Sequence, residues 1–259
     1  MLDFLNSPDV QEQLALFWEL LPGDIWDTLY TTVLATLFAY VIGLPLGILL
    51  VTGEKEGVRP LPGWFMGILN FVINILRSVP FLILMILAIP LSRIILGTSV
   101  GTAAMIPPLV IAAFPFVARM VESSLREVDH GVLEAAQAMG ASPFQIVHKV
   151  LLPEALPSLL TSATTVTITI LGYGAMAGII GGTGLGATAI NYGYYRRQTV
   201  LEYCAVIALV VLVQAVQSVG TRTAVGSDKR LTKGGRRKRL REANRQVDRD
   251  KRDISRTLH

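Results

Sequence analysis

Residues 134–153 read EAAQAMGASPFQIVHKVLLP and lie within the longest connection between two apolar segments, from about residue 122 to residue 155. Asp129 can cap a short helix that runs through Glu134–Met139, because an aspartate oxygen accepts a backbone N–H of the first turn. Gly140 can end that helix in the left-handed conformation that glycine tolerates. The stretch therefore predicts a helix that stops at a tight Gly-Ala-Ser corner.

A second helix is predicted directly after this corner. Ser142 and Gln145 match a Ser-x-x-Gln capping box, and Pro143 suits the first helical position. A polar strip then recurs at helical spacing among apolar side chains; it comprises Gln145, His148 and Lys149. We expect Pro153 and Pro157 to end this helix and to start the next apolar segment. Two short helices of this kind, lying on a membrane surface, fit a groove on a partner protein.

The composition indicates an all-α integral membrane protein. Of 259 residues, 52% are hydrophobic and 16% are charged, whereas soluble domains have roughly 25% charged residues. A transmembrane helix needs about 20 mostly apolar residues. Five stretches meet this requirement, so five transmembrane helices are predicted: Thr28–Val51, Trp64–Pro90, Ala103–Val121, Leu156–Ile180 and Leu201–Val219.

The charges predict how the chain lies in the membrane. Residues 1–221 hold 9 Lys and Arg against 14 Asp and Glu, whereas residues 222–259 hold 14 against 5. The first 24 residues carry five acids and no Lys or Arg, unlike a cleavable signal peptide, so we expect every apolar segment to be retained. Basic residues favour the cytoplasmic side, and an odd number of spans separates the termini. The C-terminus and the 122–155 connection are therefore predicted to be cytoplasmic, and the N-terminus external.

Three regions follow from this reading. Residues 1–24 form an external N-terminal segment, residues 25–222 the transmembrane domain, and residues 223–259 a basic cytoplasmic tail without fixed structure. Such a tail can hold the anionic headgroups of membrane lipids at about 1 kcal/mol per basic residue. Nucleic-acid binding is not expected.

Polar residues within the apolar segments are candidates for a transport pathway, because they tend to face a cavity or a partner helix. Asn70, Asn74 and Arg77 can share one face of the second span. They form a pathway or dimer-interface strip, or they simply hold the bundle together by hydrogen bonds; the sequence supports both readings equally. Pro80 and Pro90 are expected to kink this span.

The fourth span combines Ser and Thr with small residues, which allow helices to approach closely. Met176 is the one bulky flexible side chain between Gly174 and Gly178. An adaptable thioether could close a pathway and yield easily, so Met176, with Tyr173 nearby, is the candidate gate. Ordinary packing is the alternative.

Several function classes are not supported. The histidines His130, His148 and His259 form no ligand pattern, so we expect no catalytic residue, no metal site and no cofactor on this chain. Gly181–Gly186 lacks the Lys-Ser/Thr ending of a phosphate-binding loop and is predicted to be an external turn. An ion-coupled transporter usually has acids at mid-membrane, whereas the candidate acids lie near span ends: Glu122, Glu154 and Glu202.

The quoted stretch resembles the EAA loop of ABC-importer permeases, EAA-x3-G-x9-I-x-LP, with Val150 in place of Ile. The resemblance implies the ABC type I importer permease fold, with the loop as helices that couple the protein to a cytoplasmic ATPase. Matching positions, together with the polar strip, are the expected coupling residues: Glu134, Ala135, Ala136, Gly140, Gln145, His148, Lys149, Leu152 and Pro153.

Further runs, between about Trp26 and Arg222, resemble the methionine-uptake subfamily; they include ILRSVPF at 75–81, ARMVE at 118–122, GYGAM at 172–176 and GGTGLG at 181–186. This resemblance implies a complex in the bacterial inner membrane. It would contain two copies of the chain, two ATPases that bind ATP and Mg, and an extracytoplasmic methionine-binding protein. Another amino acid or small organic solute, or an ion-coupled transporter, remains an alternative.

Overall fold

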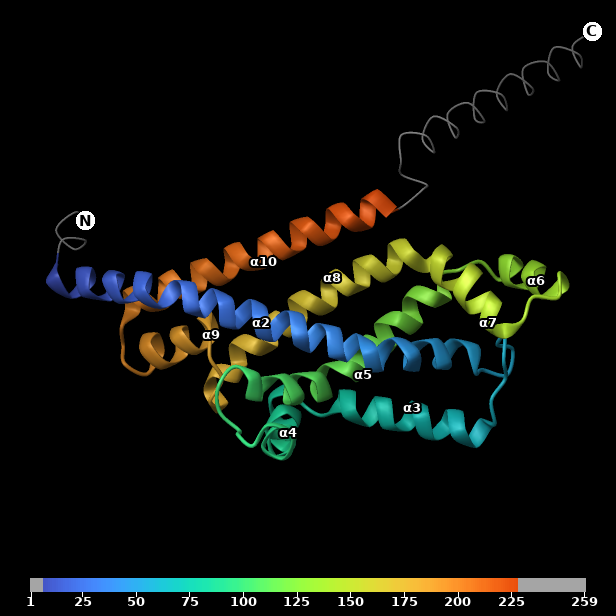
Figure 1. The fold of residues 1–259 in the computed structure, drawn as a ribbon, viewed down its shortest axis with the longest axis horizontal. Coiled ribbons are helices and arrows are strands. Elements are labelled where there is room, and N and C mark those ends of the chain that lie inside the picture. Colours follow the sequence, from blue (N-terminus) through green and yellow to red (C-terminus); the bar gives the residue numbers. More distant parts are fainter. Residues whose placement is uncertain (1–6, 228–259) are drawn as a thin grey trace, which may run out of the picture.

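The computed structural model of the protein describes residues 7–227, which form helices joined by turns, without a β-strand (Figure 1). Four helical stretches are long and apolar enough to cross a membrane: Pro8–Thr52 (α2), Ala103–Arg126, Pro143–Ile180 and Thr199–Ser227 (α10). The helices Gly63–Ser78 (α3) and Phe81–Leu96 (α4) supply a fifth if this bent pair counts as one span. The predicted all-α membrane architecture is therefore confirmed.

Two of these stretches consist of several helical pieces. Ala103–Met105 (η1) is a 3-10 turn that leads into Ile106–Arg126 (α5). The other stretch runs in chain order through Pro143–Ile146 (α7), Val147–Leu151 (η2), Leu152–Ala177 (α8) and Gly178–Ile180 (η3). The short remaining helices are His130–Ala138 (α6), Leu185–Thr188 (α9) and Ala189–Tyr194 (η4).

Helix α5 is the centre of the bundle. Its buried residues Ala113, Val117, Val121 and Leu125 recur every four positions and face α2 and α8. α2 approaches α5 closely because small residues lie on the contact. A Cβ atom on Gly43 would come 2.7 Å from Val117 Cβ. Close packing of this kind replaces the hydrophobic effect as the main attraction between helices in lipid.

The first helix is longer than the sequence predicts. α2 begins at Pro8 rather than at Thr28, and its 45 residues span about 68 Å, well beyond the roughly 30 Å hydrocarbon core. Residues 8–24, predicted to be an external segment, are therefore continuous with the first apolar helix. They pack on α10, where Gln13 Oε1 accepts the Val200 N–H at 3.1 Å and Phe17 contacts Leu201.

The second predicted span is broken. α3 and α4 meet at 108°, with Val79 extended at ψ 130° between them. Pro80 causes this break, because a residue before proline is disfavoured in the α conformation. Pro90 lies inside α4 without ending it. The second predicted span is therefore interrupted at Pro80, one of the two expected kink positions, where the chain turns almost perpendicular to α3 (Figure 1).

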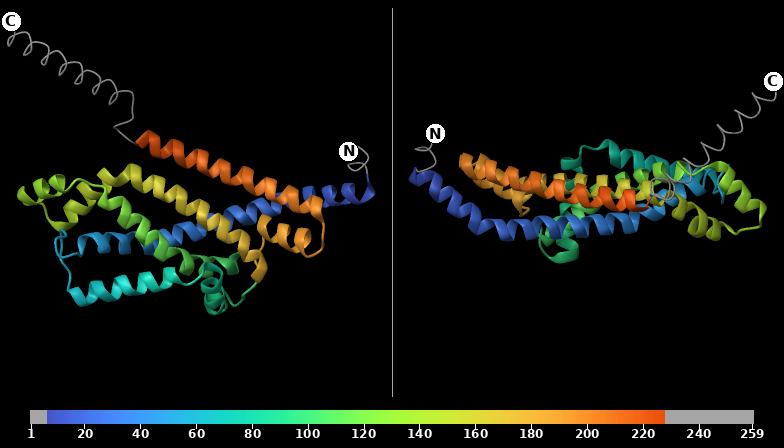
Figure 2. Two further views of the ribbon diagram at one scale, coloured as in Figure 1. Left: turned by 180° about the vertical axis from the view of Figure 1, so that it is seen from behind. Right: turned by 90° about the horizontal axis from the view of Figure 1, so that it is seen from above.

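Several helix ends gather at one end of the molecule. The ends of α2, α5 and α10 and the start of α8 lie at the end that carries α6 and α7, as the views in Figures 1 and 2 agree. α10 runs back along α8, where a Cβ atom on Gly220 would meet Thr164 Oγ1 at 2.1 Å. Most of the predicted basic tail, residues 228–259, lies outside the described residues.

Candidate functional site

Residues 127–151, which we term the connecting loop, join α5 to α8 and begin with a helix and a corner, as predicted. Asp129 caps α6 by accepting the Gly131 N–H at 2.7 Å. Gly140 has a φ of +77° and donates its N–H to the Gln137 carbonyl oxygen at 2.9 Å. A side chain is strained at this φ, so glycine fixes the direction of the corner.

The second half of the connecting loop begins with the predicted capping box. Gln145 Oε1 accepts the Ser142 N–H at 2.9 Å, and Ser142 Oγ accepts the Gln145 N–H at 3.4 Å. Gln145 therefore stabilises the start of α7, and its amide oxygen is engaged within the loop.

The prediction that Pro153 and Pro157 end this helix is wrong. The helical stretch continues from Pro143 to Ile180. Directly before Pro153 it widens into a π turn, in which the Leu152 N–H bonds to the Val147 carbonyl oxygen. The wider turn accommodates a proline that offers no N–H and whose ring clashes with the carbonyl four residues earlier in a regular α-helix.

The coupling residues predicted from the resemblance divide into an outer and an inner set. Ala136 is buried and Leu152 half-buried, so they hold the loop against the bundle. The exposed set comprises Glu134, Ala135, Gly140, Gln145, His148, Lys149 and Pro153. Beside Gly140, Met139 is 82% exposed and Phe144 is 77% exposed, and the Phe144 ring stacks on His148 with centroids 6.0 Å apart. The corner thus presents large apolar side chains outward, which is typical of a surface that a partner covers.

A hollow of about 560 Å³ lies between α6 and the turn that follows α2. Apolar residues such as Leu125 and Leu151 form part of its lining. Its charged and titratable lining residues are Glu54, Glu56, Arg126, His130 and Glu134. Glu134 therefore faces both solvent and the turn after α2, which carries Glu54 and Glu56.

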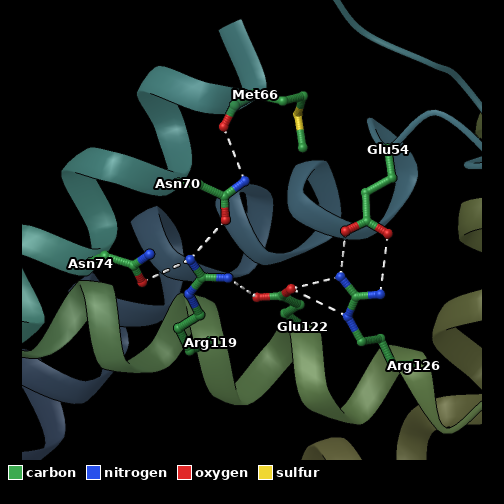
Figure 3. A network of polar contacts seen from close by, with 7 residues as sticks. All are labelled: Glu54, Met66, Asn70, Asn74, Arg119, Glu122 and Arg126. Carbon is green, nitrogen blue, oxygen red and sulfur yellow. Dashed lines mark hydrogen bonds and ion pairs between the residues drawn. The ribbon is translucent and has the colours of Figure 1, made fainter. Parts of the chain in front are cut away.

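Next to this hollow, a chain of ion pairs and hydrogen bonds crosses the bundle (Figure 3). We term it the arginine network; it comprises Glu54, Asn70, Asn74, Arg119, Glu122 and Arg126. Glu122 lies between the two arginines: Arg119 Nη1 donates to Oε2 at 2.6 Å, and Arg126 Nη2 donates to Oε1 at 2.9 Å. Arg126 also pairs with Glu54, and Arg119 Nη2 donates to the side-chain oxygens of Asn70 at 2.8 Å and Asn74 at 3.0 Å.

Glu122 lies near the end of α5, as predicted, and it is also buried. Its side chain is only 9% exposed, and both of its carboxylate oxygens are bound to arginines. Two arginine and two glutamate charges offset each other within the network, which is the condition under which buried charges are tolerated. An acid held between two cations is poorly suited to take up and release a transported ion.

The five predicted pathway residues separate in the structure. Asn70 and Asn74 bind Arg119, so they form part of the arginine network. Arg77 and Tyr173 line a hollow of about 320 Å³ at the α3–α4 bend, which we term the bend hollow. Tyr173 stacks there on Phe81, with ring centroids 3.5 Å apart. Met176 is 48% exposed on the next turn of α8 and does not line this hollow.

The glycine run at 181–186 is more than the predicted external turn. Gly181 and Gly184 have φ of +95° and +92°, and the chain then enters α9, whose four residues are all buried. The Leu185 N–H donates to Thr28 Oγ1 at 3.0 Å, and a Cβ atom on Gly186 would come 2.2 Å from Ala175 Cα. The glycines here allow close packing between α9, α2 and α8.

Sequence reasoning missed the arginine network. Arg119 entered the sequence analysis only within a run that carries the resemblance, and Glu122 entered it also as an acid near a span end; neither was assigned a partner. A signal was present, since Arg119, Glu122 and Arg126 are charged residues three and seven positions apart at the end of an apolar helix. The partners from α3 and from the turn after α2 could not be identified, because they lie 45 to 72 residues away in the chain.

Comparison with known proteins places these features in a family context. The family described as "binding-protein-dependent transport system inner membrane component" matches residues 43–233. The probable D-methionine transport system permease protein MetI of Vibrio cholerae is 49% identical over 212 residues, which are 82% of this chain and 93% of that protein. The D-methionine transport system permease protein MetI of Escherichia coli K12 is 47% identical over 163 residues, 63% of this chain and 74% of that protein.

A solved structure has the same fold. The MetNI methionine ABC transporter, in an inward-facing conformation, contains a chain that superimposes with a TM-score of 0.80 at 42% identity. The superposition covers 83% of this chain and 99% of the other.

Proposed function

Because this chain belongs to the family of binding-protein-dependent transport system inner membrane components, we propose that it carries methionine across a bacterial membrane as the permease subunit of an ABC importer. It is a multi-pass membrane protein, and ATP hydrolysis belongs to a separate subunit. The relatives named for D-methionine transport support the choice of substrate.

The observation that carries the proposal is the exposed corner of the connecting loop. Met139 and Phe144 project beside Gly140, whose left-handed backbone sets the angle between α6 and α7. We term these two exposed apolar side chains the apolar knob. Apolar side chains that project from a short helix pair can fit a groove on a partner protein. We infer that this knob docks on the ATPase, with Glu134, His148 and Lys149 around it as polar contacts.

The connecting loop is well placed to transmit force. α7 is continuous with α8 through the π turn, and α6 follows α5 after three residues, so a push on the loop acts directly on two membrane helices. We propose that ATP binding to two ATPase subunits draws the loops of two permease copies together, and that the helices then open the pathway to the outside. ATP and Mg bind the ATPase, and an extracytoplasmic binding protein delivers the solute.

The proposed orientation places the connecting loop and the C-terminus in the cytoplasm and the N-terminus outside. The positive charge of residues 222–259 supports it. Lys55 and Arg59 lie in the turn between α2 and α3, at the same end of the bundle as the connecting loop. Membrane lipids would contact the apolar faces that a single chain leaves exposed, such as that of α10.

We keep Tyr173, Met176 and Arg77 as candidate pathway residues. Tyr173 and Arg77 share the bend hollow, and Met176 is exposed one turn beyond Tyr173 on α8. In a dimer, exposed residues of α8 can meet their counterparts in the second copy. Met176 would then close a pathway shared by both chains.

The test is uptake into liposomes that contain the chain, its ATPase and the binding protein. We expect labelled D- or L-methionine to accumulate with ATP and not with a non-hydrolysable ATP analogue. Other amino acids, added as competitors, identify the preferred solute. Accumulation driven by an ion gradient without ATP would refute the proposal.

The same complex tests the docking surface. Phe144→Asp should abolish co-purification of the ATPase, because a charge replaces the apolar knob. Gln137→Asp is the matched control, since it adds the same charge at an exposed position on α6. Retention of the ATPase by Phe144→Asp would place the contact elsewhere.

A further inference from the structure

Helix α3 is attached to the bundle along one narrow face. Its buried residues are Met66 and Ile73, which pack with Leu50 of α2 and Ala118 of α5. The other faces of α3 carry exposed large side chains: Trp64, Phe65, Ile68, Phe71, Val72 and Ile75. The apolar contact that holds α3 is therefore small, unlike the long contact between α2 and α5.

The polar part of this attachment is the guanidinium group of Arg119. Asn70 and Asn74 lie between and beside Met66 and Ile73 on the same face of α3, and both amide oxygens accept from Arg119 Nη2. Asn70 Nδ2 donates to the Met66 carbonyl oxygen at 3.0 Å, which turns its oxygen toward the arginine. Hydrogen bonds to a charged donor are about twice as strong as neutral ones, and more so where solvent is excluded.

Glu122 fixes the orientation of the Arg119 guanidinium group. It binds Arg119 Nη1 from one turn further along α5, and the side chains of Arg119 and Glu122 are only 19% and 9% exposed. The other oxygen of Glu122 binds Arg126, the last residue of α5, directly before the connecting loop. The arginine network therefore runs without a gap from the base of the connecting loop to the middle of α3 (Figure 3).

The far end of α3 leads to the bend hollow. Arg77 and Ser78 of its last turn line that hollow, together with Pro80 at the 108° break and Tyr173 of α8. α3 thus spans from the end that carries the connecting loop to the candidate pathway, and only one narrow face links it to α5.

We propose that Arg119 is a positioning residue that makes α3 follow α5, so that movement of the connecting loop reaches the α3–α4 bend. This inference rests on the proposed function, because it assumes that the connecting loop is moved by an ATPase. It adds a specific link: Asn70 and Asn74 are the points on α3 at which Arg119 acts, and Glu122 holds Arg119 in place.

The test measures the movement of α3 and of the connecting loop separately, in the complete transporter with its ATPase. Spin labels are attached to Ile68→Cys on α3 or to Val132→Cys on α6, both exposed positions, after replacement of Cys204. Distances between the two copies are recorded with and without a non-hydrolysable ATP analogue. We expect both distances to change in the otherwise unaltered protein.

The variants then break the link at either side. Arg119→Met removes the guanidinium group that donates to α3. The double variant Asn70→Leu with Asn74→Leu removes the two acceptors on α3 and keeps the Arg119–Glu122 ion pair. In both, we expect the Val132 distance to change as before and the Ile68 distance to stay fixed. Solute uptake per ATP hydrolysed should fall about tenfold, the size of effect expected for loss of a charged hydrogen bond. Arg93→Met is the control, because Arg93 is an exposed arginine in α4.

Normal movement of the Ile68 label in the asparagine double variant, with normal uptake per ATP, would overturn the inference, as would a fixed Ile68 label in the unaltered protein. If Arg119→Met does not assemble, the asparagine variant alone decides. The distances test Arg119 whichever solute is carried, so failure of methionine uptake in the unaltered protein would refute the proposed function and not this link.

Discussion

The connecting loop and the α3–α4 region differ in where their geometry comes from. Hydrogen bonds between residues two or three positions apart define the helix start and the corner of the connecting loop: Asp129 with Gly131, Gly140 with Gln137, and Ser142 with Gln145. In the α3–α4 region, α3 is held instead by Arg119, which lies 49 residues from Asn70. Local geometry is encoded in a short stretch of sequence, whereas the position of α3 depends on a distant helix.

The largest expected effect comes from the corner of the connecting loop. Gly140→Val should abolish ATP-driven uptake, because a β-branched residue is strained at a φ of +77° and the angle between α6 and α7 must change. The measurement is uptake by the reconstituted complex, with membrane insertion checked on the same sample.

Gly97→Val is a matched control for this change. Gly97 has a φ of +75°, and neither glycine has an atom within 4 Å of a built Cβ, so both changes carry a similar backbone cost of about 1–2 kcal/mol. Uptake should survive at Gly97 and be lost at Gly140. Equal losses would mean that strain, and not the direction of the connecting loop, explains the effect.

A smaller effect is expected at the break between α3 and α4. Pro80→Ala removes the restriction on Val79, so part of the population should straighten. Spin labels at the exposed positions Phe71 and Leu87 should then move apart, and uptake should fall several-fold. Pro90→Ala, within a continuous α4, should change neither quantity. An unchanged distance in Pro80→Ala would mean that packing, and not the proline, sets the bend.

The smallest effect is expected from the capping box. Gln145→Ala removes the acceptor of the Ser142 N–H, and a lost cap costs about 1 kcal/mol. Hydrogen exchange of the α7 amides should accelerate roughly fivefold, with uptake little changed. Gln137→Ala on α6 should leave α7 exchange unaltered. Strong loss of uptake in Gln145→Ala would assign that side chain a contact with the ATPase.

Local rules predicted the first helix, the corner and the capping box of the connecting loop, and they failed at Pro153 and where a charge has a distant partner. The capping box and the Gly140 corner follow from spacing alone. The continuation through Pro153 was missed because a π turn absorbs the proline, which no spacing rule indicates. Asn70 and Asn74, which the spacing groups with Arg77, both bind Arg119, whereas Arg77 lines the bend hollow.

The sequence by itself determined the membrane class, the apolar segments and the connecting loop, since these depend on composition and on contacts within a few residues. The tertiary structure decided the seating of the 181–186 glycines against α2 and α8 and the arginine network. Each of these requires side chains from separate helices to meet in an interior where an unpaired charge or a displaced backbone is costly. Contacts between side chains of separate helices depend on how those helices pack, which the order of residues along the chain does not show by itself.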